Sequence, residues 1–238
     1  MKRILLLLIL LFASLQTCLH AQAETTPRRW LFNFSIGTSN TRRLTQPILP
    51  HVYYRHRDDG CFSTGVSVRY FWSKHWGIQW MNNMGQTGYS YYRDTRTSEI
   101  KGNSRGYFMN ISSGFAYRRE FKRFTLQPNF SIGLEGLNER DNTSFYLKHP
   151  DSNDTDRYNL SRNGNIGFIV NPSIYIGWKL TRRIYAFMEI TYQFSLYGTP
   201  PISASISDAF TGEGIREVSI RGKRLNRTLV KFGVTLAR

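Results

Sequence analysis

The sequence is poor in cysteine, in acidic residues and in long apolar runs. It has only two cysteines, Cys18 and Cys61, in 238 residues. Cys18 lies in an N-terminal segment that we expect to be removed, so neither an internal disulfide nor a cysteine metal cluster is predicted. Asp and Glu number 16 against 32 Lys and Arg, a net charge of +16. Beyond the N-terminus no apolar run is long enough for a transmembrane helix.

Residues 1–23 have the features of a secretory signal peptide. A basic start is followed by the apolar run Ile4–Leu15 and by the small-x-small cleavage signature Ala21-Gln22-Ala23. An uncleaved membrane anchor and lipoprotein processing at Cys18 are the alternatives, although Thr17 stands where a small Gly or Ala is expected before a lipidated cysteine. Cleavage predicts an exported protein.

Export changes the interpretation of the positive charge. In a cytosolic protein this charge would suggest nucleic acid, but an exported chain meets lipid phosphates, lipopolysaccharide and acidic glycans. We therefore predict no nucleic-acid partner. We expect residues 24–29 to form a short periplasmic segment and residues 30–238 a single domain.

Eight segments alternate apolar and polar residues with the period of two that indicates β-strands. No helical period appears after the N-terminus. The segments have about ten or more residues, roughly the length that a tilted strand needs to cross a bilayer. The predicted strands are Trp30–Thr38, Phe62–Trp72, a segment that begins at Trp76, Tyr107–Tyr117, Phe124–Glu135, Asn165–Leu180, Ala186–Leu196 and Thr228–Ala237.

The connections between these segments alternate in length. Three are short, at residues 73–75, 118–123 and 181–183. Four are long and are expected to be loops: residues 39–60, 92–105, 136–164 and 197–226. Short turns at one end and long loops at the other are typical of an antiparallel up-and-down transmembrane β-barrel, with short periplasmic turns and long extracellular loops.

The composition of the two strand faces predicts which face meets lipid. The polar face is mainly Asn, Gln, Ser, Thr and Gly, which suits a narrow interior, whereas a soluble lipocalin-like barrel would show Lys and Glu to water. Pro128 and Pro172 fall inside strands, so we expect bulges there. On the apolar face, aromatic residues gather near the short turns as a girdle is expected to do: Trp30, Tyr70, Trp72, Trp76, Tyr117 and Trp178.

Charged residues on the polar face predict a network inside the barrel. An eight-stranded barrel is just wide enough for side chains to fill it, so a diffusion pore is not expected. Glu189 and Lys231 should lie close together, because an unpaired buried carboxylate is costly. Two interpretations stay open, a plug of ion pairs and a gate or proton path. The predicted network is Glu189, Lys231, Arg69, Arg118, Lys179 and Glu135.

The long connections carry many basic residues, mostly arginines, whose guanidinium groups suit phosphate. They predict contact with outer-membrane lipid and lipopolysaccharide, or serve only to anchor the barrel in its own leaflet. The third connection, with His149 and Asp151, is acidic and polar but lacks the ligand spacing of a metal site. The basic residues are Arg42, Arg43, Arg55, Arg57, Arg93, Arg96, Lys101, Arg105, Arg216, Arg221, Lys223 and Arg224.

The chain resembles the eight-stranded OmpA/OmpX-type outer-membrane barrels over Trp30–Arg238, and is similar in size to the PorT-like barrels of type IX secretion. The first resemblance implies a structural or surface-interaction protein of the outer membrane. The second implies a protein partner in a secretion or envelope-assembly machine. The ending Thr235-Leu236-Ala237-Arg238 departs from the terminal aromatic residue usual in such barrels.

Enzymes with such barrels have signatures that this sequence lacks or carries only in part. No histidine has serine two residues later, as the His-x-Ser pair of lipid A deacylase barrels requires. Outer-membrane proteases use acidic clusters at the rim, and His56–Gly60 offers one such cluster, with His149 and Asp151 in another connection. Charged loop tips are usually solvated surface. We predict no catalytic residues, no cofactor and no metal.

Overall fold

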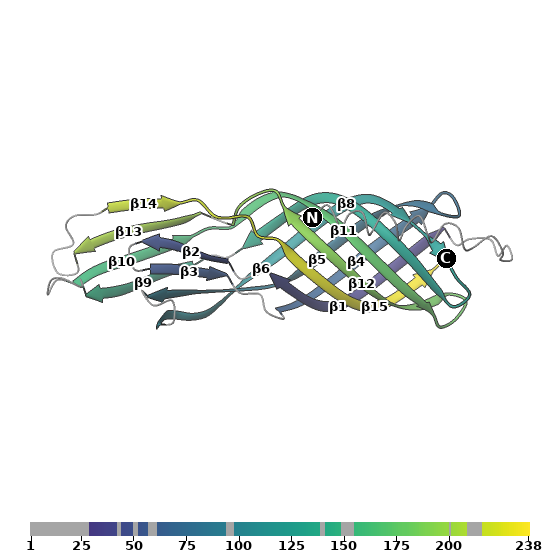
Figure 1. Cartoon of the computed structure of the whole chain (residues 1–238), viewed down its shortest axis with the longest axis horizontal. Helices are drawn as coiled ribbons and strands as arrows, with labels where there is room; N and C mark the ends of the chain where they lie inside the picture. The colour runs from purple at the N-terminus through teal and green to yellow at the C-terminus, as the bar shows by residue number, and fades with distance from the viewer. Residues whose placement is uncertain are drawn as a thin grey trace, which may run out of the picture.

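Eight long antiparallel strands close on themselves to form a barrel (Figure 1). The computed structural model describes residues 29–41, 44–49, 52–56, 61–93, 98–138, 141–148, 155–199, 201–208 and 216–238. The predicted signal peptide lies outside them. The barrel strands are, in order around the wall, β1 (Trp30–Thr41), β4 (Cys61–Phe71), β5 (Trp76–Arg93), β6 (Ser98–Tyr117), β8 (Phe124–Asn138), β11 (Asn165–Lys179), β12 (Ile184–Ser195) and β15 (Arg227–Ala237).

The first and last strands pair along their whole length and complete the wall. Leu31 lies opposite Ala237 and Thr41 opposite Arg227 in one unbroken antiparallel register. All eight predicted strands are present, and the predicted OmpA/OmpX-like barrel architecture is confirmed. Within the described residues there is no helix long and apolar enough to cross a membrane.

The alternation places polar side chains inside the barrel and apolar side chains outside. On β8, Gln127, Ser131 and Glu135 are buried in the interior, whereas Phe130 is 52% and Ile132 61% exposed. The same contrast recurs on the other seven strands. Apolar side chains exposed over the whole circumference require a solvent other than water, because monomeric soluble proteins rarely expose such large apolar surfaces.

The two strand prolines are accommodated without the bulges that the sequence led us to expect. β11 pairs with β12 on both sides of Pro172, at Val170 and at Ser173, in an unchanged register. Pro128 lies where β8 changes partner from β6 to the short β7 (Arg119–Glu120), again without a shift. A proline removes one donor but inserts no residue, so the ladder is interrupted locally and the register is kept.

Much of the sequence that was predicted as loop forms strands beyond the end of the barrel that lies opposite the short turns. β5 and β6 run on past Gly88 and Arg105, so residues 92–105 are mostly a hairpin and not a loop. They are extended by β2 (Leu44–Leu49) and β3 (Val52–His56), with β3 pairing to β5. A separate four-stranded sheet has the order β14 (Arg216–Ile220), β13 (Ile202–Asp208), β10 (Thr155–Arg162), β9 (Asp141–Lys148).

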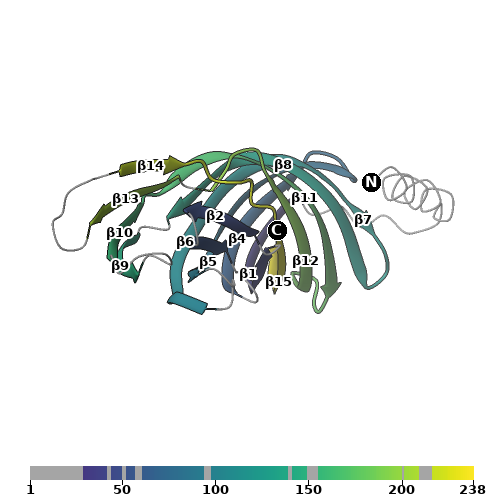
Figure 2. The ribbon, with the colours of Figure 1, turned by 60° about the vertical axis from the view of Figure 1, so that its left-hand side comes forward.

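The two sheets beyond the barrel face each other across an apolar core. Figures 1 and 2 both show the four-stranded sheet beside β2 and β3, past one end of the barrel. The β5–β6 register shifts around Tyr89 and Tyr91 as these strands leave the barrel. We call this region the outer sandwich. Its buried core is Ile48, Val52, Tyr54, Tyr89, Tyr91, Leu160, Ile202 and Ala204.

Candidate functional site

A carboxylate between two cations forms the centre of the barrel interior. Glu189 on β12 accepts from Arg69 on β4, with Nη2 and Oε1 2.7 Å apart, and from Lys231 on β15, with Nζ and Oε2 3.2 Å apart. Ser173 also donates to Oε1, at 3.2 Å. The three charged side chains are at most 2% exposed. The register explains the meeting, because Glu189 and Lys231 are directly opposite on neighbouring strands.

Amide oxygens solvate the excess positive charge of this cluster. Arg69 donates through Nε to Gln79, at 3.3 Å, and through Nη1 to Gln127, at 3.2 Å. Its guanidinium also lies 4.4 Å from the centre of the Tyr175 ring. Lys231 donates to Asn83 Oδ1 at 2.9 Å. Each nitrogen of Arg69 therefore has an oxygen acceptor, as buried charge requires.

A second ion pair lies nearer the outer sandwich. Arg227 Nη1 and Glu135 Oε2 are 2.6 Å apart, and both side chains are buried. Tyr197 donates to Glu135 Oε1 at 2.7 Å, and Gln193 also donates to this carboxylate. Arg227 stacks on Phe108, with 3.8 Å between the guanidinium carbon and the ring centre. Arg227 was not among the residues predicted for the interior, although it has the same strand parity as Lys231.

A run of side-chain amides joins the two clusters. From Lys231 the hydrogen bonds pass to Asn83, from Asn83 to Asn110 at 3.0 Å, and from Asn110 to Gln193 at 3.0 Å. Gln193 then donates to Glu135. Every amide in the run donates through its nitrogen and accepts through its oxygen. The two charged clusters thus belong to one hydrogen-bonded network, which favours the interpretation as a plug of ion pairs and amides.

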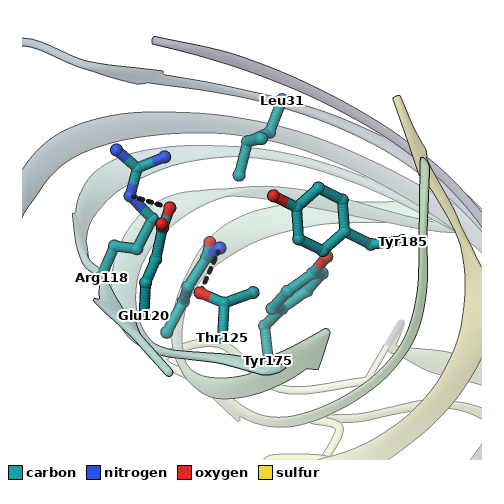
Figure 3. A pocket seen from close by; sticks show the side chains of 7 residues that line it. Leu31, Arg118, Glu120, Thr125, Tyr175 and Tyr185 are labelled. Carbon is teal, nitrogen blue, oxygen red and sulfur yellow. Dashed lines mark hydrogen bonds and ion pairs between the residues drawn. The ribbon is translucent and has the colours of Figure 1, made fainter. Parts of the chain in front are cut away.

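Arg118 lies at the short-turn end and has different neighbours from the central cluster. It approaches Glu120, with Nε and Oε1 3.4 Å apart, and stacks 4.0 Å from the Phe71 ring centre. Figure 3 shows this pair on one side of a recess, with Tyr175 and Tyr185 on the other. The recess has no room for a water molecule. Burial lowers the pKa of Arg118, and Glu120 partly offsets this.

Lys179 does not belong to the interior. The sequence pattern gave it the same parity as Tyr175, but it is the last residue of β11 and its side chain is exposed. The backbone N–H of Lys179 donates to Arg123 O at 2.8 Å. A side chain at the end of a strand passes beyond the wall, so strand parity alone could not place it.

Apolar side chains close both ends of the polar interior. The short-turn end contains a cluster of Leu31, Phe71, Ala116, Tyr185 and Ala237. The opposite end contains a cluster of Phe108, Leu137, Leu225 and Leu229, with Leu44 against it. The polar side chains of the network lie between these two clusters.

The six predicted girdle residues all lie near the short turns. Trp30 and Tyr70 are cross-strand partners with ring centres 4.7 Å apart, and Trp76 and Tyr117 are partners at 5.0 Å. The remaining two are Trp72 and Trp178, which are 51% and 52% exposed. Trp80, which is not at the girdle level, is also exposed on the wall.

The basic residues predicted for the loops differ in exposure where the structure describes them. Arg221, Lys223 and Arg224 have exposed side chains. Arg55 is half-buried and stacks 4.1 Å from the Tyr92 ring centre. Arg105 is exposed on β6. Outside the described residues lie Arg42, Arg43, Arg57 and Arg96, and the side chains of Arg93, Lys101 and Arg216 are not described.

Arg162 and His56 are buried in the outer sandwich. Arg162 lies 4.3 Å from the Tyr54 ring centre, and His56 Nδ1 is 3.2 Å from the Tyr54 hydroxyl. The sequence analysis placed both residues in loops, which gave no reason to expect burial. His56 therefore does not form an exposed rim cluster. The acidic residues 58, 59 and 151 and His149 lie outside the described residues.

Among the described residues, no group of three His, Cys, Asp or Glu side chains is arranged to hold a metal ion. Cys61 is half-buried at the start of β4 and is not in a disulfide. The polar groups inside the barrel are amides, hydroxyls and charged pairs.

Comparisons with known proteins give likeness of fold alone. No protein-family model matches the chain, and no curated protein matches it. Among solved structures, it is similar to Ail, the attachment invasion locus protein of Yersinia pestis, at 9% identity and TM-score 0.41 over 88% of this chain and 99% of that one. It is also similar to the outer membrane protease OmpT from Escherichia coli, at 10% identity and TM-score 0.41, over 91% of this chain and 99% of that one. A third similar structure is a major outer membrane protein from Thermus thermophilus, at 8% identity and TM-score 0.43, over 88% of this chain and 99% of that one.

Proposed function

We propose that this chain is an outer-membrane barrel that acts as a surface-interaction protein, with basic extracellular side chains that bind lipopolysaccharide phosphates. The observation that carries the membrane assignment is the exposed apolar face around the whole wall. Residues such as Ile36 and Phe115, each 62% exposed, would be costly in water and are favourable in hydrocarbon. The alternation therefore has lipid outside and a polar plug inside.

The filled interior argues for a scaffold and against a pore. Two ion pairs and a run of amides occupy the centre, and apolar clusters close the ends. Conduction of a solute would require these contacts to be broken together. We therefore assign the working surface to the end that carries the outer sandwich, since recognition on rigid scaffolds usually lies in the connecting segments.

The segment between β14 and β15 holds three basic side chains in a fixed backbone. Gln46 donates to Arg221 O at 2.8 Å, and Thr199 N donates to Lys223 O at 2.8 Å. Arg224 bridges to Gly198. The side chains of Arg221, Lys223 and Arg224 remain exposed. We call these three residues the basic segment. A pre-ordered backbone lowers the entropic cost of binding a phosphate.

The test combines localisation with binding. In washed outer-membrane fractions, the unheated mature protein should migrate as a compact band that shifts on boiling. Arg221→Gln, Lys223→Gln and Arg224→Gln together should reduce binding of lipopolysaccharide to the detergent-folded barrel, and the loss should shrink as salt rises. A matched control is Lys179→Gln with Arg182→Gln and Arg183→Gln at the opposite end, where the side chains are also exposed. Equal losses in both variants, or a soluble protein without a shift, would refute the proposal.

A further inference from the structure

A hollow lies on the outer wall where the barrel meets the outer sandwich. It measures about 1230 Å³ and crosses β4, β5, β6 and β8 to the start of β11. That volume exceeds the roughly 300–1,000 Å³ of typical small-ligand pockets. We call it the wall hollow. Its place in the fold, its uncharged lining and the basic residue beside it suggest what occupies it.

The hollow coincides with a fork between the two outer sheets. The pairing of β6 with β8 ends at Tyr107 and Asn138, and β6 continues outward with β5 alone. β8 and β11 stop pairing at Leu137 and Asn165, and the chain on that side enters the four-stranded sheet. The wall therefore divides at this level, and the division leaves a concave space on the membrane side.

The lining of the hollow is arranged in two rows of cross-strand neighbours. The inner row, at the edge of the apolar wall, runs Thr64, Met84, Met109, Gly136 and Ile166. Gly136 forms its floor, because a Cβ at that position would meet nothing closer than 3.9 Å. Met109 and Ile166 stand on either side of it, 46% and 73% exposed. This row presents an apolar trough without side chains at its centre.

The next row outward is polar over β5, β6 and β8, while the exposed Phe62 lines its β4 side. Gln86, Tyr107 and Asn138 follow one another across β5, β6 and β8, and Asn163 and Gly164 also line this side. Two residues beyond Tyr107, on the same face of β6, is the exposed Arg105. From the membrane outward, the wall over β5, β6 and β8 thus passes from apolar side chains to the neutral polar Gln86, Tyr107 and Asn138. On β6 the cationic Arg105 follows, just beyond the lining of the hollow.

We propose that the wall hollow binds one phosphorylated, acylated glycolipid of the outer leaflet, a molecule with the chemistry of lipid A. Its acyl chains would lie over Gly136 between Met109 and Ile166. Its sugar hydroxyls would meet Gln86 and Asn138, and a phosphate would meet Arg105. The order of the three rows matches the order of groups in such a lipid. This proposal rests on the proposed membrane function.

The test uses the full mature barrel folded in dodecyl maltoside, with purified lipid A as the probe and native mass spectrometry as the readout. One lipid A should remain on the wild type. Gly136→Phe should lower that occupancy about tenfold, because it fills the trough, and the open space at Gly136 lets the barrel fold. The matched control is Ile132→Phe on the same outward face of β8, which adds bulk outside the lining and should leave occupancy unchanged.

A second pair of variants tests the phosphate contact. Arg105→Gln should lower lipid A occupancy several-fold, whereas Arg182→Gln at the opposite end should have no effect. With dephosphorylated lipid A, the wild type and Arg105→Gln should have the same lipid occupancy, because Arg105 then has no phosphate to contact. An Arg105 effect that persists without phosphate would overturn that assignment.

The outcomes separate this inference from the proposed function. If Gly136→Phe behaves like Ile132→Phe while the basic-segment variants still lose lipopolysaccharide, the wall hollow is not the site and the proposed function stands. Retention of phosphate-free alkyl detergent in place of lipid A would overturn the assigned occupant. If the wild type binds neither lipopolysaccharide nor lipid A, both the proposed function and the wall-hollow inference are refuted.

Discussion

The barrel and the outer sandwich are built from the same alternating strands but have opposite interiors. Inside the barrel, Gln79, Asn83 and Thr87 of β5 are fully or almost fully buried among polar groups. A few residues further along the same strand, Tyr89 and Tyr91 lie in the apolar core of the sandwich. Alternation thus specifies two faces, and the surrounding solvent specifies which face is buried.

The largest expected effect is the loss of the central carboxylate. Glu189→Leu leaves Arg69 and Lys231 buried without their shared partner, and should cost about 3–5 kcal/mol of unfolding free energy. Lys231→Met in the same chain should recover part of the loss by removing one stranded charge. Urea unfolding of the single and double variants measures the coupling. Strictly additive losses would mean that the pair does not interact.

A core truncation in the sandwich should have a large but local effect. Leu160 is fully buried between the two outer sheets, so Leu160→Ala should cost about 2–5 kcal/mol there. Protease should then cut the outer strands more readily, while the barrel keeps its heat-dependent gel shift. Loss of that shift at the same protease dose would show that the two regions unfold as one unit and would weaken the comparison.

One charged substitution tests whether the outward face of the barrel contacts lipid. Ile174 is 42% exposed on the wall, between Pro128 of β8 and Ile190 of β12. Ile174→Arg should cost about 2–4 kcal/mol of barrel stability in bilayers if it lies near the midplane. Arg157, exposed on the outer sandwich, provides a control, because Arg157→Ile should change barrel stability little. A negligible cost for Ile174→Arg would mean that this face does not contact lipid.

The sequence could predict the parts of the site that depend on strand parity. Parity within β12 and β15 predicted that Glu189 and Lys231 point inward and lie close together. Parity also assigned Arg69 and Glu135 to the interior, where both are buried. Parity failed at Lys179, because the side chain of the last residue of a strand can extend past the end of the barrel into solvent. It failed at Arg227 because the predicted strand began one residue too late.

Alternation in the sequence by itself determined the eight barrel strands, their two faces and the aromatic positions near the short turns. Only the tertiary structure decided that Arg227 pairs with Glu135, that amides join the two charged clusters, and that the expected loops pair into a sandwich around Tyr54 and Leu160. The physical reason is the range of each interaction. Strand periodicity is local and is written in neighbouring residues, whereas these contacts join segments far apart in the chain and exist only after the wall has closed.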